Sequence, residues 1–172
     1  MKNKYILLDR DGTLIKHVHH LVDPDQLELL PNSFNGLAIL RDNGFRFGVI
    51  TNQSVINRGK TTIEKICEIN QKMVSLFISS GITIDFIYIC PHTPNENCEC
   101  RKPNISNGIK AIREFNILIE ESYMIGDMLT DVEFGVNLGM KTIQIGSEFV
   151  QNSQANYLAT DILDAANWIL EQ

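Results

Sequence analysis

Two carboxylates, Asp9 and Asp11, follow a short apolar segment near the start of the chain, in the stretch LLDRDGTLIK. Asp and Gly favour turns, so a strand that ends in a turn is the simplest explanation of this pattern. A carboxylate can also attack phosphorus and form an aspartyl phosphate. In that reaction Asp9 is the candidate nucleophile, and Asp11 is the candidate acid for the leaving alkoxide and base for the attacking water.

Polar side chains of the kinds that this chemistry needs also follow three later apolar segments. They are Thr51, Asn52, Gln53 and Ser54 after the second segment, Arg101 and Lys102 beyond the third, and Asp127 and Asp131 at the fourth. Asp9 and Asp127 could share a Mg²⁺ ion, which prefers oxygen ligands and would offset the repulsion between them. Thr51, Asn52 and Lys102 would neutralise the charge of a phosphoryl group during its transfer.

The segments that must position these residues alternate between strand and helix along the chain. Strands are predicted at YILLD, RFGVIT, IDFIYIC, ESYMIGD and KTIQIG, and helices at NSFNGLAILRDNG, TTIEKICEINQKMVSLFISSG, NGIKAIREFN, TDVEFGVNLG and DILDAANWILEQ. Such an alternation predicts an α/β fold, a doubly wound parallel sheet with helices on both faces. The segment SEFVQNSQANYLAT before the last helix is predicted to be a loop. Ligands of such sheets bind outside the carboxyl ends of the strands, where the polar residues lie.

The length and charge of the chain limit its class. Its 172 residues suit a single domain, 1–172, with a substantial core. The formal net charge of -6 comes without a basic stripe or patch, so neither nucleic acid nor a membrane is an expected partner. No apolar run approaches the length of a membrane helix, and the amino terminus does not resemble a signal peptide. We therefore expect a soluble, cytoplasmic monomer that acts on a small phosphorylated metabolite.

Three of the four cysteines crowd into one short segment together with a histidine. The potential metal ligands are Cys90, His92, Cys98 and Cys100, in CPHTPNENCECRKP. Three thiolates and one imidazole complete the tetrahedral shell of a structural zinc, although free cysteines in a loop are the alternative. Zinc would fold this loop, residues 90–102, and hold Arg101 and Lys102 beside the phosphate site. The fourth cysteine, Cys67, is predicted to be a buried helix residue without a functional role.

Four motifs, DRDGT, TNQS, RKP and GDMLTD, resemble in this order the motifs of the haloacid dehalogenase superfamily of phosphatases, and they cover most of the chain. The resemblance implies a Rossmann-like core and dependence on Mg²⁺, with Asp9 as nucleophile and Asp11 as general acid/base. It also implies the roles of the other motif residues: Thr51 and Lys102 hold the phosphoryl group, Asp9, Asp11 and Asp127 lie on the metal, and Asp131 supports these ligands from behind.

The zinc loop joined to RKP narrows the resemblance to a subgroup whose members hydrolyse D-glycero-D-manno-heptose 1,7-bisphosphate or histidinol phosphate. LVDPDQLELLPNS and TNQSVINRGK look more like the heptose enzymes, which implies a 7-phosphatase of heptose nucleotide biosynthesis. The short zinc loop looks as much like that of the histidinol enzymes, so histidinol phosphate is the alternative substrate. Met128 stands where family members commonly carry Lys or Arg, and Val55 where the heptose enzymes have glycine.

Substrate specificity is expected to come from loops around the site. Only about forty residues separate Asp11 from Thr51, which leaves no room for a cap domain there and predicts a minimally capped, open site. The expected substrate contacts are His17, His19, His20, Asn52, Gln53, Ser54, Arg58 and Arg101. Two other classes stay open: a non-catalytic phospho-acceptor domain and a zinc-dependent structural or nucleic-acid-binding module. Asp11 argues against the first class and the acidic charge against the second.

Overall fold

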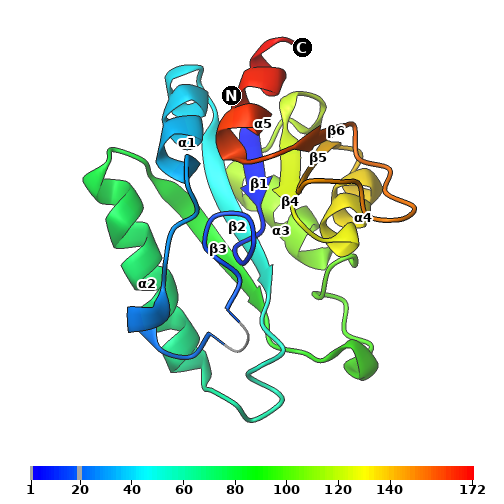
Figure 1. The fold of residues 1–172 in the computed structure, drawn as a ribbon. Helices are drawn as coiled ribbons and strands as arrows, with labels where there is room; N and C mark the ends of the chain where they lie inside the picture. Colours follow the sequence, from blue (N-terminus) through cyan, green and yellow to red (C-terminus); the bar gives the residue numbers. More distant parts are fainter. Residues whose placement is uncertain (1, 19–20) are drawn as a thin grey trace.

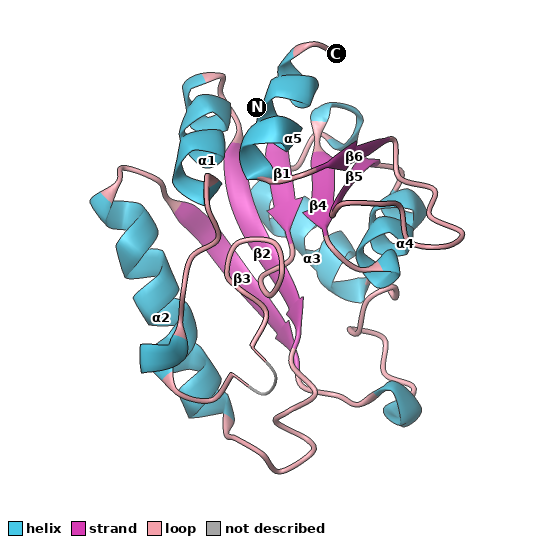
Figure 2. Cartoon of the chain, viewed as in Figure 1, coloured by secondary structure: helices cyan, strands magenta, loops and turns pink. Residues whose placement is uncertain are grey.

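A six-stranded sheet with helices on both faces is present in the computed structural model, which describes residues 2–18 and 21–172 (Figures 1 and 2). The strands are β1 (Tyr5–Leu8), β2 (Arg46–Asn52), β3 (Ile84–Cys90), β4 (Tyr123–Gly126), β5 (Lys141–Ile145) and β6 (Tyr157–Ala159). They lie in the order β3-β2-β1-β4-β5-β6, and every neighbouring pair is parallel. The predicted fold class, a doubly wound parallel α/β sheet, is confirmed.

The helices cover the two faces of the sheet in two groups. They are α1 (Ser33–Asp42), α2 (Ile63–Ser79), α3 (Ser106–Phe115), α4 (Leu129–Leu138) and α5 (Ile162–Leu170). Two clusters of buried apolar residues show that α1, α2 and α5 pack on one face, and α3 and α4 on the other. Because both faces are covered, the strands are continuous apolar runs: in β1, Ile6 and Leu8 belong to one cluster, and Tyr5 and Leu7 to the other.

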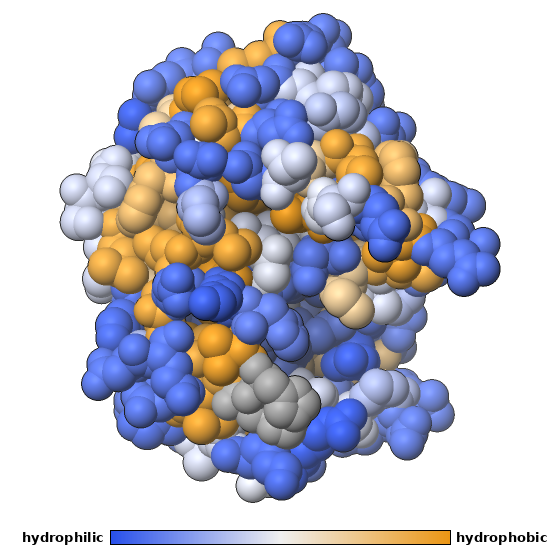
Figure 3. Space-filling model, viewed as in Figure 1, coloured by the Kyte–Doolittle hydropathy of each residue, from blue (hydrophilic) through white to orange (hydrophobic). Residues whose placement is uncertain are grey.

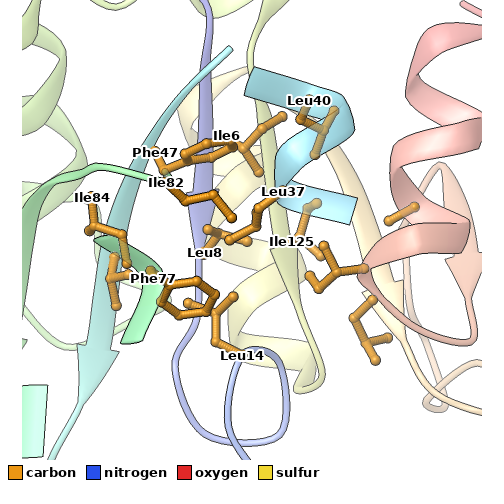
Figure 4. Packing of buried hydrophobic residues seen from close by; sticks show 14 of the residues in the cluster. Ile6, Leu8, Leu14, Leu37, Leu40, Phe47, Phe77, Ile82, Ile84 and Ile125 are labelled. Carbon is orange, nitrogen blue, oxygen red and sulfur yellow. The ribbon is translucent and has the colours of Figure 1, made fainter. Parts of the chain in front are cut away.

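The larger cluster packs the central strands against α1 and α2 (Figure 4). Leu37 of α1 and Phe77 of α2 are fully buried together with Ile6 and Leu8 of β1. Complete burial of such a side chain contributes roughly 1.5–3 kcal/mol relative to its exposure. The packing holds β1 firmly on both faces, so the residue that follows it, Asp9, has a fixed position.

Two predictions about secondary structure and burial are wrong. The segment expected to be a loop contains β6, which is three residues long and is defined by its pairing with β5. Three residues are too few to show a strand period in the sequence. Cys67, expected to be buried, is exposed. The buried stripe of α2 runs through Ile66, Ile69, Met73 and Phe77, and leaves Cys67 on the solvent side.

The sheet order brings the polar strand ends together. Strands β2, β1 and β4 are neighbours, so their carboxyl ends place Thr51, Asp9 and Asp127 side by side. The chain order reverses beside β1, because β2 and β3 lie on one side and β4 to β6 on the other. Ligands of α/β sheets bind at such reversal points. Between β1 and β2, the described residues form one short 3₁₀ helix, η1 (Pro24–Gln26), and α1.

None of the helices in the described ranges is long and apolar enough to cross a membrane.

Candidate active site

A buried cluster of charges lies at the carboxyl end of β1. Asp9 follows β1 directly, and its Oδ1 accepts a hydrogen bond from Lys102 Nζ at 2.6 Å. The same ammonium lies 2.7 Å from Asp131 Oδ1 and donates to Ile50 O at 2.6 Å. Asp9, Asp131 and Lys102 are all buried. One lysine therefore holds two carboxylates from distant parts of the chain beside the end of β1.

Burial and crowding change the protonation of these groups. Burial raises the pKa of Asp9 to about 7; Lys102 opposes this shift, and the carboxylate of Asp131 adds to it. Burial also raises the pKa of Asp127 to about 6, again with a contribution from Asp131. Burial alone would lower the pKa of Lys102, but the carboxylates of Asp131 and Asp9 raise it. Three carboxylates thus share one ammonium, and a further cation would stabilise their charged forms.

Oxygen ligands for such a cation come from Asp9, Asp127 and Asp131, one carboxylate oxygen from each, all within 4.8 Å of one another. Asp127 Oδ1 is buried and has no hydrogen-bond partner among the described residues. Clustered carboxylate oxygens, one of them without a partner, fit Mg²⁺, which binds oxygen and keeps several waters. The Asp11 carboxylate, predicted to be a metal ligand, is not a member of this group, and Asp131 is its third member.

Gly12 leaves the space that Asp127 occupies. Its φ of 80° lies in the left-handed region, and a Cβ atom there would be 2.3 Å from Asp127 Oδ2. A Cβ atom on Gly126 would likewise be 2.4 Å from Asp131 Oδ2. Both glycines allow the backbone to approach a carboxylate of the cluster more closely than any other residue could. Gly12 therefore serves the turn after β1 and the carboxylate cluster at the same time.

Asp11 faces a different set of partners. Its Oδ2 accepts hydrogen bonds from Arg10 Nε at 3.0 Å and from Gln53 Nε2 at 2.8 Å. The Gln53 amide also donates to Thr51 Oγ1 at 2.8 Å. Gln53, which was predicted to contact the substrate, is therefore engaged in hydrogen bonds inside the protein. The Arg10 guanidinium is fully buried and donates from Nη1 to Asn70 Oδ1 of α2 at 2.8 Å.

Arg10 and Asn70 are site residues that the sequence reasoning missed. A signal for Arg10 was present, because a charged residue between two carboxylates at the end of an apolar run has no simple structural purpose. Asn70 had a weaker signal: it stands in α2 directly after Ile69, within the buried part of the helix. Buried polar side chains are hydrogen-bonded, so a polar residue beside an apolar stripe indicates a specific partner.

Asn52 also uses its side chain inside the protein. Its Oδ1 accepts a hydrogen bond from Lys102 N at 3.1 Å, and its Nδ2 donates to Lys102 O at 3.2 Å. This reciprocal pair fixes the backbone of Lys102 to the end of β2. On the other side of the same loop, Asn107 of α3 donates to Cys100 O at 3.3 Å. The position of Lys102 therefore depends both on β2 and on the loop that precedes it.

That loop gathers the four predicted zinc ligands, Cys90, His92, Cys98 and Cys100, into one group. Five of the separations between their sulfur and Nδ1 atoms range from 3.2 to 3.7 Å. A tetrahedral zinc with its usual bond lengths requires sulfur atoms about 3.8 Å apart, and a sulfur and a nitrogen slightly closer. The four donors therefore lie close enough together to share one zinc ion, directly before Arg101 and Lys102, although Cys90 Sγ and Cys100 Sγ, 3.2 Å apart, would have to separate.

The remaining predicted substrate residues in the described ranges line two pockets, and Asp11 lines the first of them. One pocket of about 290 Å³ is lined by Asp11, His17, Val18, Leu21, Asn52, Gln53, Ser54, Val55 and Arg58. His19 and His20 lie outside the described residues. Arg101 lines a second pocket, of about 280 Å³, and its Nη1 donates to His92 O at 3.1 Å. In the space-filling view, hydrophilic side chains dominate the hollowed region where the strands end, beside an apolar strip (Figure 3).

Known proteins resemble this chain in sequence and in fold. Residues 99–167 match a family model described as HAD-hydrolase-like. Over 140 residues, the chain is 38% identical to the D-glycero-beta-D-manno-heptose-1,7-bisphosphate 7-phosphatase of Helicobacter pylori, and the match covers 81% of each protein. The chain belongs to the HAD-like hydrolase family. Within this family of hydrolases it is a phosphatase, which confirms the predicted enzyme class.

Two further relatives match this HAD-like phosphatase over almost its whole length. The histidine biosynthesis bifunctional protein HisB of Legionella pneumophila is 33% identical over 165 residues, which cover 95% of this chain and 47% of that protein. A crystal structure of the D,D-heptose 1,7-bisphosphate phosphatase from B. bronchiseptica, complexed with magnesium and phosphate, matches with a TM-score of 0.86. That protein is 25% identical, and 98% of each chain is covered.

Proposed function

We propose that this HAD-like phosphatase removes the 7-phosphate of D-glycero-D-manno-heptose 1,7-bisphosphate through an aspartyl phosphate on Asp9, and that residues 1–172 act as one catalytic domain. The observation that carries the proposal is the convergence of Asp9, Lys102, Asp127 and Asp131 beside Asp11. Such a site combines a nucleophile, a fixed cation, candidate metal ligands and a separate acid/base.

In the first step, a carboxylate oxygen of Asp9 attacks phosphorus, and the bond from phosphorus to the ester oxygen breaks. Asp11 gives its proton to this oxygen, so the alcohol leaves in its neutral form. Thr51 and Lys102 hold the oxygens of the transferring phosphoryl group and neutralise part of their charge. Lys102 is suited to this role because it already lies 2.6 Å from Asp9 Oδ1.

In the second step, Asp11 is ionised and takes a proton from a water molecule. The water oxygen attacks phosphorus as its proton leaves, and the bond to the Asp9 carboxylate breaks. Inorganic phosphate departs, and Asp9 returns to its starting form. The pocket that Asp11 lines is open, so water can reach the aspartyl phosphate once the alcohol has left.

Mg²⁺, when bound, supplies positive charge that aligns the phosphate with the nucleophile and stabilises charge in the transition state. Asp9 and Asp127 are the proposed ligands, together with Asp131, which also accepts a hydrogen bond from Met128 N at 3.0 Å through Oδ2. The partnerless Oδ1 of Asp127 supports this assignment. Binding of magnesium by the structural relative from B. bronchiseptica gives it independent support.

The substrate assignment rests on relatives named for heptose bisphosphate, such as the protein from Helicobacter pylori. Histidinol phosphate is the second candidate, because the match to HisB extends over 95% of this chain. Both compounds are small phosphate monoesters of an alcohol, and the same two steps would hydrolyse either. Only the side chains around the leaving alcohol can discriminate between them.

A direct comparison of the two substrates tests the proposal. We expect kcat/KM, measured by phosphate release in the presence of Mg²⁺, to be higher for the heptose bisphosphate than for histidinol phosphate. Phosphorus NMR of the product should show loss of the 7-phosphate, and removal of Mg²⁺ with a chelator should stop the reaction. A higher kcat/KM for histidinol phosphate would contradict the heptose assignment and make histidinol phosphate the substrate. Absence of Mg²⁺-dependent release from every phosphate monoester would contradict the enzymatic mechanism itself.

We also propose that the Cys/His loop binds one structural zinc per chain. The Cys98→Ser variant is expected to lose zinc, as measured by atomic absorption, and to lose thermal stability and activity together. The physical reason is that the loop is polar and has no core of its own, so it depends on the metal for its fold. Cys67→Ser is the matched control, because Cys67 is exposed and outside the loop. Equal zinc content and stability in wild type and Cys98→Ser would refute the site.

A further inference from the structure

The partners of Asp11 form a chain of hydrogen bonds that reaches from the site into α2. Arg10 donates from Nη1 to Asn70 Oδ1 at 2.8 Å, and its Nη2 lies 2.9 Å from Asp11 Oδ2 and 3.2 Å from Asp11 Oδ1. With its Nε on Oδ2 as well, the guanidinium approaches the carboxylate as a fork. The Arg10 side chain is 0% exposed, and Asn70 is 5% exposed. The chain thus runs from Asp11, at the edge of the pocket, to two side chains that are enclosed in protein.

The two oxygens of Asp11 are left in unequal situations by these contacts. Oδ2 accepts from both Arg10 Nε and Gln53 Nε2, whereas the one contact that Oδ1 receives from the described residues is the longer one from Arg10 Nη2. An ionised carboxylate has about two acceptor positions on each oxygen, so Oδ2 is saturated and Oδ1 keeps a free one. Asp11 also lines the open pocket, so a leaving group or a water molecule can approach its carboxylate.

Stability does not explain why an arginine is buried here. Removing a guanidinium from water is costly, and buried ion pairs often contribute little net stability compared with apolar residues of the same volume. A buried fork does fix the orientation of its partner, because its donors are planar and rigid. Asn70 in turn fixes the fork, since it accepts the one hydrogen bond that points away from Asp11.

We infer that Arg10 and Asn70 are positioning residues, which hold the Asp11 carboxylate so that Oδ1 is the oxygen that gives and takes the proton. This inference rests on the proposed role of Asp11 as general acid/base. Neither residue touches the substrate: Arg10 acts through Asp11, and Asn70 acts through Arg10. Loss of Asn70 should therefore weaken proton transfer to the leaving group, and should leave the attack by Asp9 intact.

Substrates with different leaving groups separate this role from a merely structural one. 4-Nitrophenolate leaves without a proton, whereas phenolate and an alkoxide need one, and kcat/KM reports the first step alone. The leaving-group ratio is kcat/KM for a substrate that needs the proton, phenyl phosphate or the heptose bisphosphate, divided by kcat/KM for 4-nitrophenyl phosphate. In Asn70→Ala this ratio should fall about 10- to 100-fold. Asn70→Asp keeps an acceptor in the same place and should restore the wild-type ratio.

Ser122→Ala is the matched control for a loss of buried hydrogen bonds, because Ser122 lies before β4 at the far end of the sheet and accepts from Tyr5 N at 2.9 Å. It should lower the melting temperature without changing the ratio. Should Asn70→Ala fail to fold, Asn70→Ser, whose hydroxyl is too short to replace the amide, takes its place with the same expected result. If kcat/KM of Asn70→Ala falls equally for all substrates, or does not fall, the positioning role is overturned. An active wild type would still uphold the proposed function in that case. An inactive wild type would overturn both.

Discussion

Asp9→Asn is expected to abolish turnover, with a loss of kcat on the order of 10⁶-fold, as when an enzyme loses its nucleophile. The amide is nearly the same size as the carboxylate but cannot form the aspartyl phosphate. The variant should nevertheless fold and keep its full zinc content. Lys102 retains Asp131 as a partner at 2.7 Å, so the lysine is not left unpaired. Phosphate release and zinc content, measured on the same sample, check this expectation.

The stability of Asp9→Asn adds a second readout. Because burial raises the folded-state pKa of Asp9 from 3.8 to about 7, the ionised side chain is unfavourable in the metal-free protein. The folded protein therefore keeps its full free energy of unfolding below pH 3.8, where Asp9 is protonated in both states. The free energy of unfolding then falls as pH rises from 3.8 to about 7. A neutral amide avoids this loss, so at pH 8 with a chelator the variant should melt no lower than wild type. Asp42→Asn, an exposed site on α1, is the control and should keep full activity. Retained turnover in Asp9→Asn would remove Asp9 from the nucleophile role.

Asp11→Asn is expected to slow both steps of the reaction, since proton transfer by a positioned side chain contributes about 10²- to 10⁴-fold. The effect should depend on the substrate. With 4-nitrophenyl phosphate, the first step needs no acid and should stay fast, whereas hydrolysis of the aspartyl phosphate still needs the base. The variant should therefore release one equivalent of 4-nitrophenolate in a rapid burst and then turn over slowly.

Stopped-flow absorbance measures this burst, and acid quenching followed by mass spectrometry should find phosphate on Asp9. In Asp11→Asn, the oxygen of the new amide can still accept a hydrogen bond from Arg10, so the fold of the loop should persist.

The control should lie outside the site. Gln53→Glu would be a poor control, because it would place a second carboxylate against Asp11, whose Oδ2 the Gln53 amide contacts at 2.8 Å in the wild type. Asp25→Asn is suitable, since Asp25 is exposed and forms a surface ion pair with Lys72. Unchanged steady-state turnover of Asp11→Asn without a burst would exclude Asp11 from acid/base catalysis.

Most of the sheet could be predicted from the sequence because both of its faces are buried. That burial produces continuous apolar strands, and helices between them with a clear apolar stripe. The strand β6 could not be predicted, since it has only three residues, which gain their strand conformation from pairing with β5. Cys67 was misplaced for a related reason: helical periodicity indicates a stripe, but a residue at its edge can face either way.

The candidate site could be predicted to the level of which strand ends meet, but not to the level of which atoms pair. Carboxylates after β1 and β4 were recognisable because parallel strands end at one edge of the sheet. The side chains of Asn52 and Gln53 looked equally suited to a substrate. Only the folded structure engages them with Lys102 and Asp11. Local spacing could not reveal such contacts, which join residues 50 and 42 positions apart.

Figure 1 shows both ends of the described chain at the top of the sheet, whereas β1, the strand that Asp9 follows, ends lower in the view. A protein tethered at either end would hold its catalytic edge outward, away from the attachment point. Such a layout makes the unit modular, since another domain can be joined to it without blocking substrate entry. HisB from Legionella pneumophila is named a bifunctional protein, and the match covers 47% of it, so that relative extends well beyond the part that resembles this chain.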